Sequence, residues 1–164
     1  MSLTQLTWRF LDLKHTVGNL ATGKHTEQSQ PDVNELSSGN ANDGVFSRSC
    51  AKNGCAHPTS GNNRFWSIDL ADSYYVSEIL ILQRQDCCQE RLHNFEVRIG
   101  NASASSGVLN PRCGGLYSMV GITVMVIRCE PYSYGRYLII SIPGPSQTLT
   151  LCEVSIFQID NGKI

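Results

Sequence analysis

Short segments with the alternating pattern of β-strands are the feature that most restricts the fold of this chain. In one of them, Trp66, Ile68 and Leu70 occupy every second position, which places them on one face of an extended strand. Turns rich in Gly, Pro and Asn separate such segments, and no stretch shows the periodicity of a long amphipathic helix. The pattern predicts a single all-β domain, a β-sandwich or jelly roll, with strands at Phe65–Leu70, Tyr75–Leu82, Phe95–Ile99, Met119–Ile127, Tyr137–Ile142 and Val154–Ile159.

The part of the chain before these strands is of a different character. From Asn19 to Asp43, and on to Gly61, Gly, Asn, Ser and Pro recur, and we expect a long loop region there. Long structured loops in compact domains are commonly functional. Residues 1–16 carry apolar side chains without clear periodicity, so we expect an N-terminal extension that forms an edge strand or lies against the core.

Composition excludes several classes of function. A length of 164 residues suits one domain with a real core. The net charge is −1 and the basic residues are scattered, so no basic stripe is available to bind nucleic acid. The longest apolar stretches, Val76–Leu82 and Met119–Ile127, are far shorter than the roughly 20 residues that cross a bilayer. We therefore expect neither nucleic acid nor inserted membrane as a partner.

Seven cysteines are dispersed along the chain, without the paired spacing or neighbouring histidines of a zinc site. In a small β-rich domain, dispersed cysteines predict disulfides and an oxidising compartment. The first residues, MSLTQLTWRFLDLK, lack the pattern of a signal peptide. We expect a secreted protein whose signal has been removed, with one cysteine unpaired or shared with a partner.

The stretch Arg84–Arg91, with the sequence RQDCCQER, holds two arginines, two acids and two adjacent cysteines. Such arginines and acids are by default a surface ion-pair cluster of little energetic value. Adjacent cysteines normally pair with separate partners, because their Cα atoms lie only about 3.8 Å apart. Arginine, however, offers five donors in a planar fork, which suits a hydroxyl-rich ligand.

Several motifs together resemble those of one known family. They are Cys55-Ala-His57, Phe65-Trp-Ser-Ile-Asp-Leu70, the stretch Arg84–Arg91, Asn19-Leu-Ala-x-Gly-Lys24, Gly135-Arg-Tyr137 and Leu151-Cys-Glu153. In residues and spacing they resemble the F-type lectins, and the resemblance covers residues 17–160. It implies an eight-stranded, discoidin-like (galactose-binding-domain-like) β-jelly roll, a calcium ion and L-fucose as the ligand. Residues 161–164 are then a C-terminal tail.

The resemblance also implies a site. His57, Arg84 and Arg91 correspond to the family's triad, which hydrogen-bonds the sugar, and a Cys87–Cys88 disulfide packs against the sugar's face. Asp86 and Glu90 are expected to orient the arginines. In the same family pattern, Cys55 pairs with Cys152 and Cys113 with Cys129, whereas Cys50 has no counterpart and is a candidate inter-chain link.

A structural calcium ion is the implied cofactor. The family pattern gives it side-chain oxygens of Asp43 and Glu153 and carbonyl oxygens of Asn40, Val45, Gly54 and Cys152. Oxygen ligands suit Ca²⁺, which takes about six to eight of them. Gly54 replaces a serine that also donates its hydroxyl. The alternative is that Asn40–Gly44, with the sequence NANDG, is only a tight turn.

The resemblance predicts a lectin that is not an enzyme, with fucosylated glycans as partners, acting as a homo-oligomer or as part of a multidomain protein in cell or microbe recognition. One alternative is a glycosidase using Asp86 and Glu90, but the flanking arginines would depress both pKa values and disfavour a general acid. The other is a discoidin-like phospholipid or protein adhesion module. The loops are mostly Asn, Ser, Gly and Gln, which offers few large apolar residues for insertion.

Overall fold

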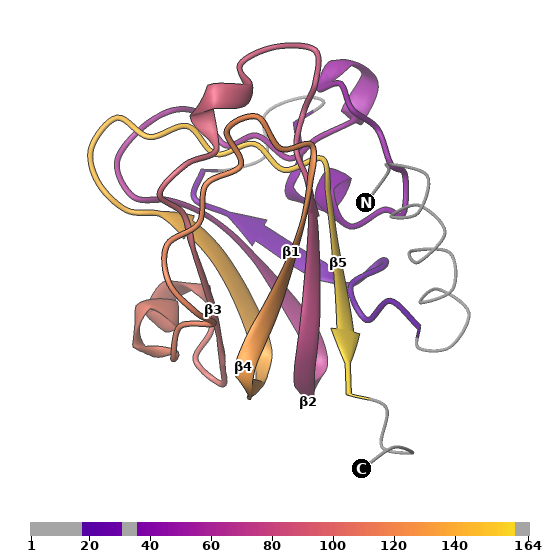
Figure 1. Cartoon of the computed structure of the whole chain (residues 1–164), viewed down its shortest axis with the longest axis vertical. Helices are drawn as coiled ribbons and strands as arrows, with labels where there is room; N and C mark the ends of the chain where they lie inside the picture. The colour runs from indigo at the N-terminus through magenta and orange to yellow at the C-terminus, as the bar shows by residue number, and fades with distance from the viewer. Residues whose placement is uncertain (1–17, 31–35, 160–164) are drawn as a thin grey trace.

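The computed structural model describes residues 18–30 and 36–159, which form an all-β fold, as predicted (Figure 1). The expected extension at residues 1–16 and the tail at residues 161–164 lie outside the described residues. The strands are β1 (His25–Gln28), β2 (Arg64–Leu82), β3 (Glu96–Gly100), β4 (Val124–Ile142) and β5 (Glu153–Gln158). Four short 3-10 helices lie between them: η1 (Ser38–Ala41), η2 (Ala51–Asn53), η3 (Gln89–Arg91) and η4 (Ala104–Leu109).

Two strands are longer than the sequence pattern indicated. The expected strands Phe65–Leu70 and Tyr75–Leu82 are both parts of β2, and Tyr137–Ile142 is the end of β4. The pairing of β2 with β4 continues past the polar residues in its middle, with shifts of register there. Five strands are therefore defined in the described part of the chain, rather than the eight of the expected jelly roll.

Two further expectations need correction. The strand expected at Met119–Ile127 begins only at Val124, because the residues before it form a turn in which Gly121 has φ +76° and Ile122 donates to the carbonyl of Met119. Strand β1 lies in the segment expected to be all loop. Its four polar residues give no alternation, and its strand conformation comes from antiparallel pairing with β2.

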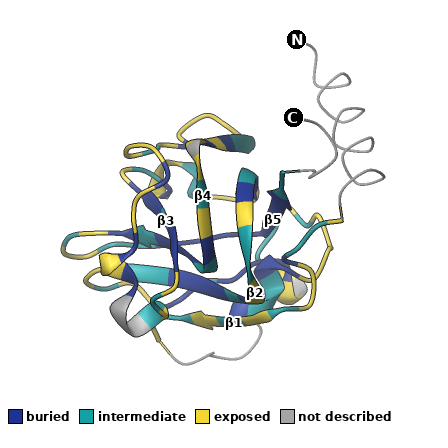
Figure 2. Cartoon of the chain, turned by 90° about the horizontal axis from the view of Figure 1, so that it is seen from below, coloured by how far each residue is buried: buried dark blue, intermediate teal, exposed yellow. Residues whose placement is uncertain are grey.

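The pairings fall into two groups that enclose the core. The first half of β2 pairs with β1 and with the end of β4, which also pairs with β3. The second half of β2 pairs with β5 and with the start of β4. Buried side chains from both groups, such as Trp66, Ile81 and Ile156, belong to one cluster, and Figure 2 shows the buried residues along these strands. Full burial of each such side chain contributes about 1.5–3 kcal/mol.

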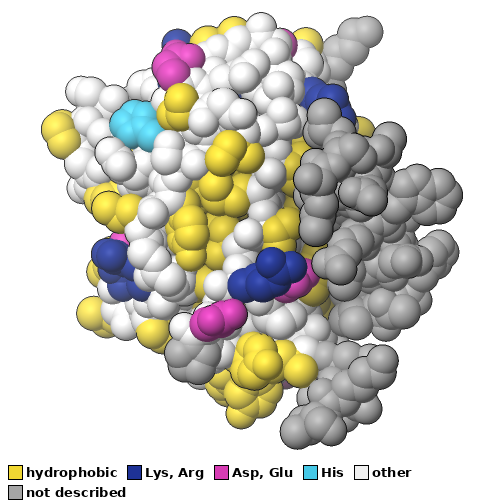
Figure 3. All heavy atoms as spheres, viewed as in Figure 1, with side chains coloured by type: hydrophobic (Ala, Val, Ile, Leu, Met, Phe, Trp, Pro, Cys, Tyr) yellow, Lys and Arg dark blue, Asp and Glu magenta, His cyan; other side chains and the backbone are white. Residues whose placement is uncertain are grey.

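The outer face of the second group carries some apolar side chains. Val124 and Val126 of β4 point to the same side of the strand and are partly exposed, and Figure 3 shows hydrophobic side chains gathered down the middle of this face. Apolar atoms supply more than half of the surface of ordinary folded proteins, so this strip by itself defines no binding site.

Two of the family-like motifs meet across the sheet. Asp69 of β2 faces Tyr137 in register, and both carboxylate oxygens of Asp69 accept hydrogen bonds at 2.7 Å from the neighbouring Arg136. This bidentate pair keeps the pKa of Asp69 below its ordinary value. The sequence motifs around Asp69 and Arg136 therefore serve the strand pairing, at a distance from the loops that carry the site.

Gly135 lies where β4 passes closest to Gly100 of β3. A Cβ atom at Gly135 would overlap the backbone of Gly100, which cannot move aside without breaking the strand pairing. We predict that Gly135→Ala lowers the free energy of unfolding by about 1–3 kcal/mol, the usual cost of overpacking. Thermal unfolding measures this, with Gly115→Ala as the control, since a Cβ there meets nothing within 4 Å. Equal melting temperatures for the two variants would contradict the prediction.

The loops that carry the site meet at one end of the sheet. Leu82, at the end of β2, pairs with Val124 at the start of β4 and with Glu153 at the start of β5. A bridge between Ala56 and Leu151 brings the segment around His57 to the same end, which is the upper end in Figure 1. The described residues include no helix long and apolar enough to cross a membrane.

Candidate functional site

The three expected disulfides are all present. Cys55 is bonded to Cys152, Cys87 to Cys88, and Cys113 to Cys129. The Cys55–Cys152 bond is fully buried and joins the segment before His57 to the start of β5. It therefore fixes the position of two of the loops at the site.

The loop after β2 presents Arg84 through an ion pair with Asp86. The Nε and Nη2 atoms of Arg84 donate to the two carboxylate oxygens of Asp86 at 2.8 and 2.9 Å. Residues two apart on an extended segment face the same way, and this spacing made the pair predictable. Only two of the five guanidinium donors are used in this pair, so the other N–H groups of Arg84 can reach a ligand.

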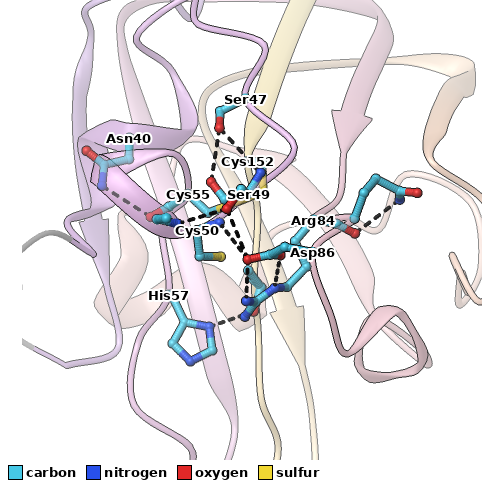
Figure 4. Close-up of a disulfide and its surroundings, with 12 residues drawn as sticks. Asn40, Ser47, Ser49, Cys50, Cys55, His57, Arg84, Asp86 and Cys152 are labelled. Atoms are coloured by element: carbon cyan, nitrogen blue, oxygen red, sulfur yellow. Dashed lines mark hydrogen bonds and ion pairs between the residues drawn. A yellow bond between two sulfur atoms is a disulfide. The ribbon is translucent and has the colours of Figure 1, made fainter.

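Asp86 also joins this loop to the loop before η2 (Figure 4). Its carboxylate accepts hydrogen bonds from the hydroxyl of Ser49 at 3.1 Å and from the backbone N–H groups of Cys50 and Cys87 at 3.3 and 3.1 Å. The Arg84 guanidinium, followed by the Ser49 hydroxyl, holds the pKa of Asp86 well below its usual range. Asp86 therefore stays ionised and holds the guanidinium of Arg84 by two hydrogen bonds.

The Cys87–Cys88 disulfide lies at the tip of the same loop. Cys87 is exposed and Cys88 half-buried, so the bond presents an apolar surface to solvent. Cys88 has φ +60°, in the left-handed region, and caps η3, which carries Arg91. The disulfide thus separates the two arginines along the chain while fixing the backbone between them.

His57 lies between the two loops and is oriented from a distant part of the chain. Its Nδ1 is 2.6 Å from the hydroxyl oxygen of Thr150, which is buried. Burial, followed by the positive charges of Arg84 and Arg91, lowers the pKa of His57 below 6.5. The imidazole is therefore neutral at pH 7, with Nε2 available to a ligand. Because the charges of both arginines act on its pKa, the three members of the expected triad lie near one another.

Glu90 holds its arginine less firmly than Asp86 does. The distance from Glu90 Oε1 to Arg91 Nε is 3.8 Å, and the two side chains are 70% and 45% exposed. Exposed pairs of this kind contribute little and are easily rearranged. Arg91 is thus anchored mainly through its backbone, since its N–H donates to the carbonyl of Cys88.

The low pKa of His57 leads to a prediction about stability. Well above pH 6.5 the histidine is neutral in both folded and unfolded chains, whereas near and below pH 6.5 the unfolded chain binds a proton more readily. The free energy of unfolding should therefore fall as the pH drops from 6.5 toward the folded pKa, by less than the limit of about 1.4 kcal/mol per pH unit for one group.

Urea unfolding of the wild type and of His57→Gln at several pH values measures this contribution. We expect the wild type to lose more stability than His57→Gln between neutral and mildly acidic pH, because glutamine does not titrate. Parallel pH profiles for the two proteins would contradict the assigned direction of the pKa shift.

The six residues expected to bind calcium come from three segments that the structure joins. The Nδ2 of Asn40 in η1 donates to the carbonyl of Cys55 at 3.2 Å, and the Cys55–Cys152 bond leads to Glu153. The turn after η1 holds Asp43, Gly44 and Val45, with Asp43 Oδ1 accepting from the N–H of Val45 at 2.7 Å. Asn40 thus lies in a 3-10 helix and Asp43 in the turn directly after it, and the hydrogen bond from Asn40 ties this part of the chain to the Cys55 segment.

The donor set fits a calcium ion. Glu153 is fully buried, and a carboxylate in that setting needs a nearby positive charge or several hydrogen bonds. The remaining expected ligands are oxygens, which suit a hard cation. At Gly54 a Cβ would overlap the carbonyl oxygen of Ser49 and the hydroxyl of Ser47, which explains why the chain has no serine there.

Residues that support the site were missed by sequence reasoning. Ser49 lies 37 residues from Asp86, and Thr150 lies 93 residues from His57. No local pattern links such pairs. The loops at this end also expose Val45, Phe46, Leu116, Val120 and Ile122. The expectation of few large apolar side chains in the loops was therefore wrong.

Cys50 is the cysteine that takes no part in a disulfide. It is half-buried and packs against Cys55, Leu82 and Cys152. Burial raises the pKa of the Cys50 thiol to about 11. The thiol is therefore protonated at neutral pH and faces the interior of the loop cluster.

Comparisons with known proteins show which family this chain resembles. The sequence matches the family described as "NedA-like, galactose-binding domain" over residues 39–140. The fucolectin of Anguilla anguilla is 33% identical over 146 residues, which cover 87% of this chain and 92% of that protein. The pentraxin fusion protein of Xenopus laevis is 32% identical over 115 residues, which cover 70% of this chain and 27% of that protein.

A solved structure gives the same result. The f-lectin (fucolectin) from the serum of Morone saxatilis, the striped bass, has a TM-score of 0.81 and 32% identity. The match covers 90% of this chain and 52% of that one. This chain thus spans about half of the bass lectin and about a quarter of the pentraxin fusion protein, but nearly all of the eel fucolectin.

The fold and these comparisons together define a discoidin-like, galactose-binding-type β domain whose relatives are lectins rather than enzymes. The chain belongs to the F-type lectin, or fucolectin, family, as its motifs predicted.

Proposed function

We propose that this chain is a lectin that binds terminal L-fucose on glycans through His57, Arg84 and Arg91, with the Cys87–Cys88 disulfide against the sugar ring. The observation that carries the proposal is that the three donors share one site, in which Asp86 fixes Arg84 and Thr150 fixes His57. A neutral sugar presents hydroxyls and a ring oxygen, and these donors supply hydrogen bonds without requiring a charged ligand.

A glycan array followed by calorimetry with free L-fucose tests this function. Fucose has about 11 heavy atoms, and at about 0.4–0.5 kcal/mol each the dissociation constant is about 0.1–1 mM. We expect fucosylated glycans to be bound, and free fucose to inhibit that binding. Retention of glycans without fucose, uninhibited by the free sugar, would refute the proposal.

The glycosidase alternative is disfavoured by the geometry of the site. A general acid must hold a proton near neutral pH. Asp86 instead accepts two hydrogen bonds from Arg84, which keep its pKa well below the usual range. Asp86 therefore serves as an anchor for the arginine.

The discoidin-like adhesion alternative is favoured by one observation, the exposed Val45, Phe46 and Val120 in the loops at this end. Apolar loop tips are what a lipid surface takes up. Liposome co-sedimentation distinguishes the two functions. A lectin that binds no lipid stays in the supernatant. Sedimentation of the protein with liposomes, if fucose does not inhibit it, would favour the adhesion function.

We also propose that Asn40, Asp43, Val45, Gly54, Cys152 and Glu153 hold a structural Ca²⁺. The ion would supply positive charge beside the buried Glu153 and fix loops that have little regular structure. In this chain Asn40 and the Cys55–Cys152 bond already hold the three segments together, so the ion would add rigidity to a formed site.

Removing the ion is therefore expected to lower the melting temperature. Ligand at 100 times its dissociation constant stabilises a protein by about 2.7 kcal/mol, which for a domain of this size corresponds to several degrees. Differential scanning fluorimetry with Ca²⁺ or a chelator measures this, with Asp43→Ala as the variant and Asp72→Ala on β2 as the control. Equal responses to Ca²⁺ in both variants would argue against the site.

A single weak site implies assembly. Useful binding to a cell surface needs several sites on one particle. We propose that the chain acts as a homo-oligomer or within a longer protein, and that it is secreted, in keeping with its three disulfides. Analytical ultracentrifugation of the native protein tests the assembly, and a uniform monomer with a single lectin domain would contradict it.

A further inference from the structure

Three cysteine sulfurs lie together beside the sugar site. The Sγ atoms of Cys50, Cys55 and Cys152 are all within 4.8 Å of one another. Cys55 and Cys152 share a disulfide, while Cys50 keeps its thiol. Figure 4 shows Cys50 next to this bond, in the loop cluster that also holds His57 and Asp86.

A thiol held next to a disulfide has a defined chemistry. The thiol first loses its proton, which the raised pKa of Cys50 makes infrequent at neutral pH and more frequent at alkaline pH. The thiolate then attacks one of the two sulfurs, a new S–S bond forms as the old one breaks, and the other sulfur leaves as a thiolate that takes up the proton. No oxidant or reductant is consumed, because one disulfide and one thiol are present before and after. When the groups are held close together in one molecule, the reaction needs no encounter with a second molecule.

We propose that Cys50, Cys55 and Cys152 form a thiol–disulfide exchange site, in which Cys50 takes either Cys55 or Cys152 as its partner. Attack on Cys55 gives a Cys50–Cys55 bond and a thiol at Cys152. Attack on Cys152 gives a Cys50–Cys152 bond and a thiol at Cys55. The contact between the three side chains is direct, since Cys50 packs against the cluster of Cys55, Leu82 and Cys152.

The local backbone favours such an exchange. Cys50 and Cys55 stand on either side of η2, and Gly54 is packed so tightly against Ser47 and Ser49 that a side chain there would overlap them. Residues 47–55 therefore already fold back on themselves. A bond within this turn closes only a short loop, which needs less rearrangement than a new bond between distant segments.

Exchange would change the geometry of the sugar site through two connections. The backbone N–H of Cys50 donates to Asp86, which holds Arg84, and Cys55 is two residues before His57. Loss of the Cys55–Cys152 bond also removes the covalent link between the His57 segment and β5. A consequence for fucose affinity rests on the proposed function, whereas the exchange itself does not.

Variants that remove one partner test whether Cys50 is within reach. In Cys152→Ser we expect a Cys50–Cys55 bond, and in Cys55→Ser a Cys50–Cys152 bond, each leaving no unbonded thiol when the oxidised protein is unfolded and alkylated. Peptide mapping by mass spectrometry without reductant identifies the bonds. The matched control is Cys129→Ser, in which Cys50 and Cys113 should both be alkylated. Two alkylated cysteines in both Cys152→Ser and Cys55→Ser would overturn the proposal.

The wild-type protein tests the exchange itself. The native protein is incubated at mildly alkaline pH, quenched with acid, unfolded, alkylated and mapped. We expect the alkyl label to appear on Cys55 or Cys152 in addition to Cys50, together with the matching bonded peptide, and Cys50→Ser to show no label at all. Label confined to Cys50 at every time point would overturn the proposal. Neither measurement uses the sugar, so failure of the exchange proposal is distinguishable from failure of the proposed lectin function.

Discussion

Replacing Arg84 by alanine is expected to abolish measurable fucose binding. Arg84 is 14% exposed and held by two hydrogen bonds to Asp86, so its remaining donors reach a ligand with little loss of side-chain entropy. Hydrogen bonds from a charged donor contribute about 1.5–3 kcal/mol. Two of them correspond to an affinity loss of at least about 100-fold, which moves a millimolar site beyond the range of calorimetry.

Two further variants separate the arginine's charge from its geometry. Arg84→Lys keeps the charge but loses the planar fork, so we expect most of the loss to persist. Asp86→Asn keeps Arg84 but weakens the contacts that orient it, and a loss of about tenfold is expected, equal to about 1.4 kcal/mol. The ordering Arg84→Ala, Arg84→Lys, Asp86→Asn, from largest to smallest effect, is the result that identifies Asp86 as a positioning residue.

The control is Arg128→Ala. Arg128 forms an ion pair of 2.8 Å with Glu78 between β4 and β2, outside the loops of the site. Its loss should leave fucose affinity unchanged, and all four variants should show nearly wild-type melting temperatures, because partly exposed ion pairs contribute little to stability. Wild-type affinity in a folded Arg84→Ala protein would mean that the sugar binds elsewhere.

The strands were predictable where one face is buried. Trp66, Ile68 and Leu70 alternate because every second residue of β2 enters the core, and the structure buries all three. The continuity of β2 was not predictable, since Ala71 has φ +70° and the polar residues after it look like a loop. Their place in a long strand depends on pairing with β4, which no local pattern contains.

The residues of the site were also predictable only in part. Arg84 and Asp86 were predictable as a pair, because two residues along an extended segment point to the same side. Thr150 was not, because its contact with His57 is set by the fold and not by sequence spacing. Side chains that approach the motif from other segments, such as Ser49 at Asp86, depend on how the loops are packed against each other. Residues within the motifs were therefore predicted, including Asp86, and the residues that approach them from other segments, Ser49 and Thr150, were missed.

The second large effect expected is on stability, from the disulfide beside the site. The Cys55–Cys152 bond spans 97 residues, whereas Cys113–Cys129 spans 16. If a disulfide acts by restricting the unfolded chain, a loop of about 100 residues corresponds to about 4.7 kcal/mol and one of about 15 residues to about 3 kcal/mol. We therefore expect the double variant Cys55→Ser/Cys152→Ser to lose more free energy of unfolding than Cys113→Ser/Cys129→Ser. The difference between about 4.7 and about 3 kcal/mol is about 1–2 kcal/mol.

Urea unfolding of the two double variants measures the difference under matched conditions. Both pairs of cysteines are almost fully buried, and each double variant replaces two cysteines by two serines, so the cost of burying the new hydroxyls is similar in the two variants. The variants should also differ in function. Loss of Cys55–Cys152 releases the segment that carries His57 from β5, and fucose affinity should fall. The Cys113–Cys129 variant should bind normally, because that bond lies outside the triad. Equal losses of stability with unchanged binding in both would show that hydrogen bonds alone position His57.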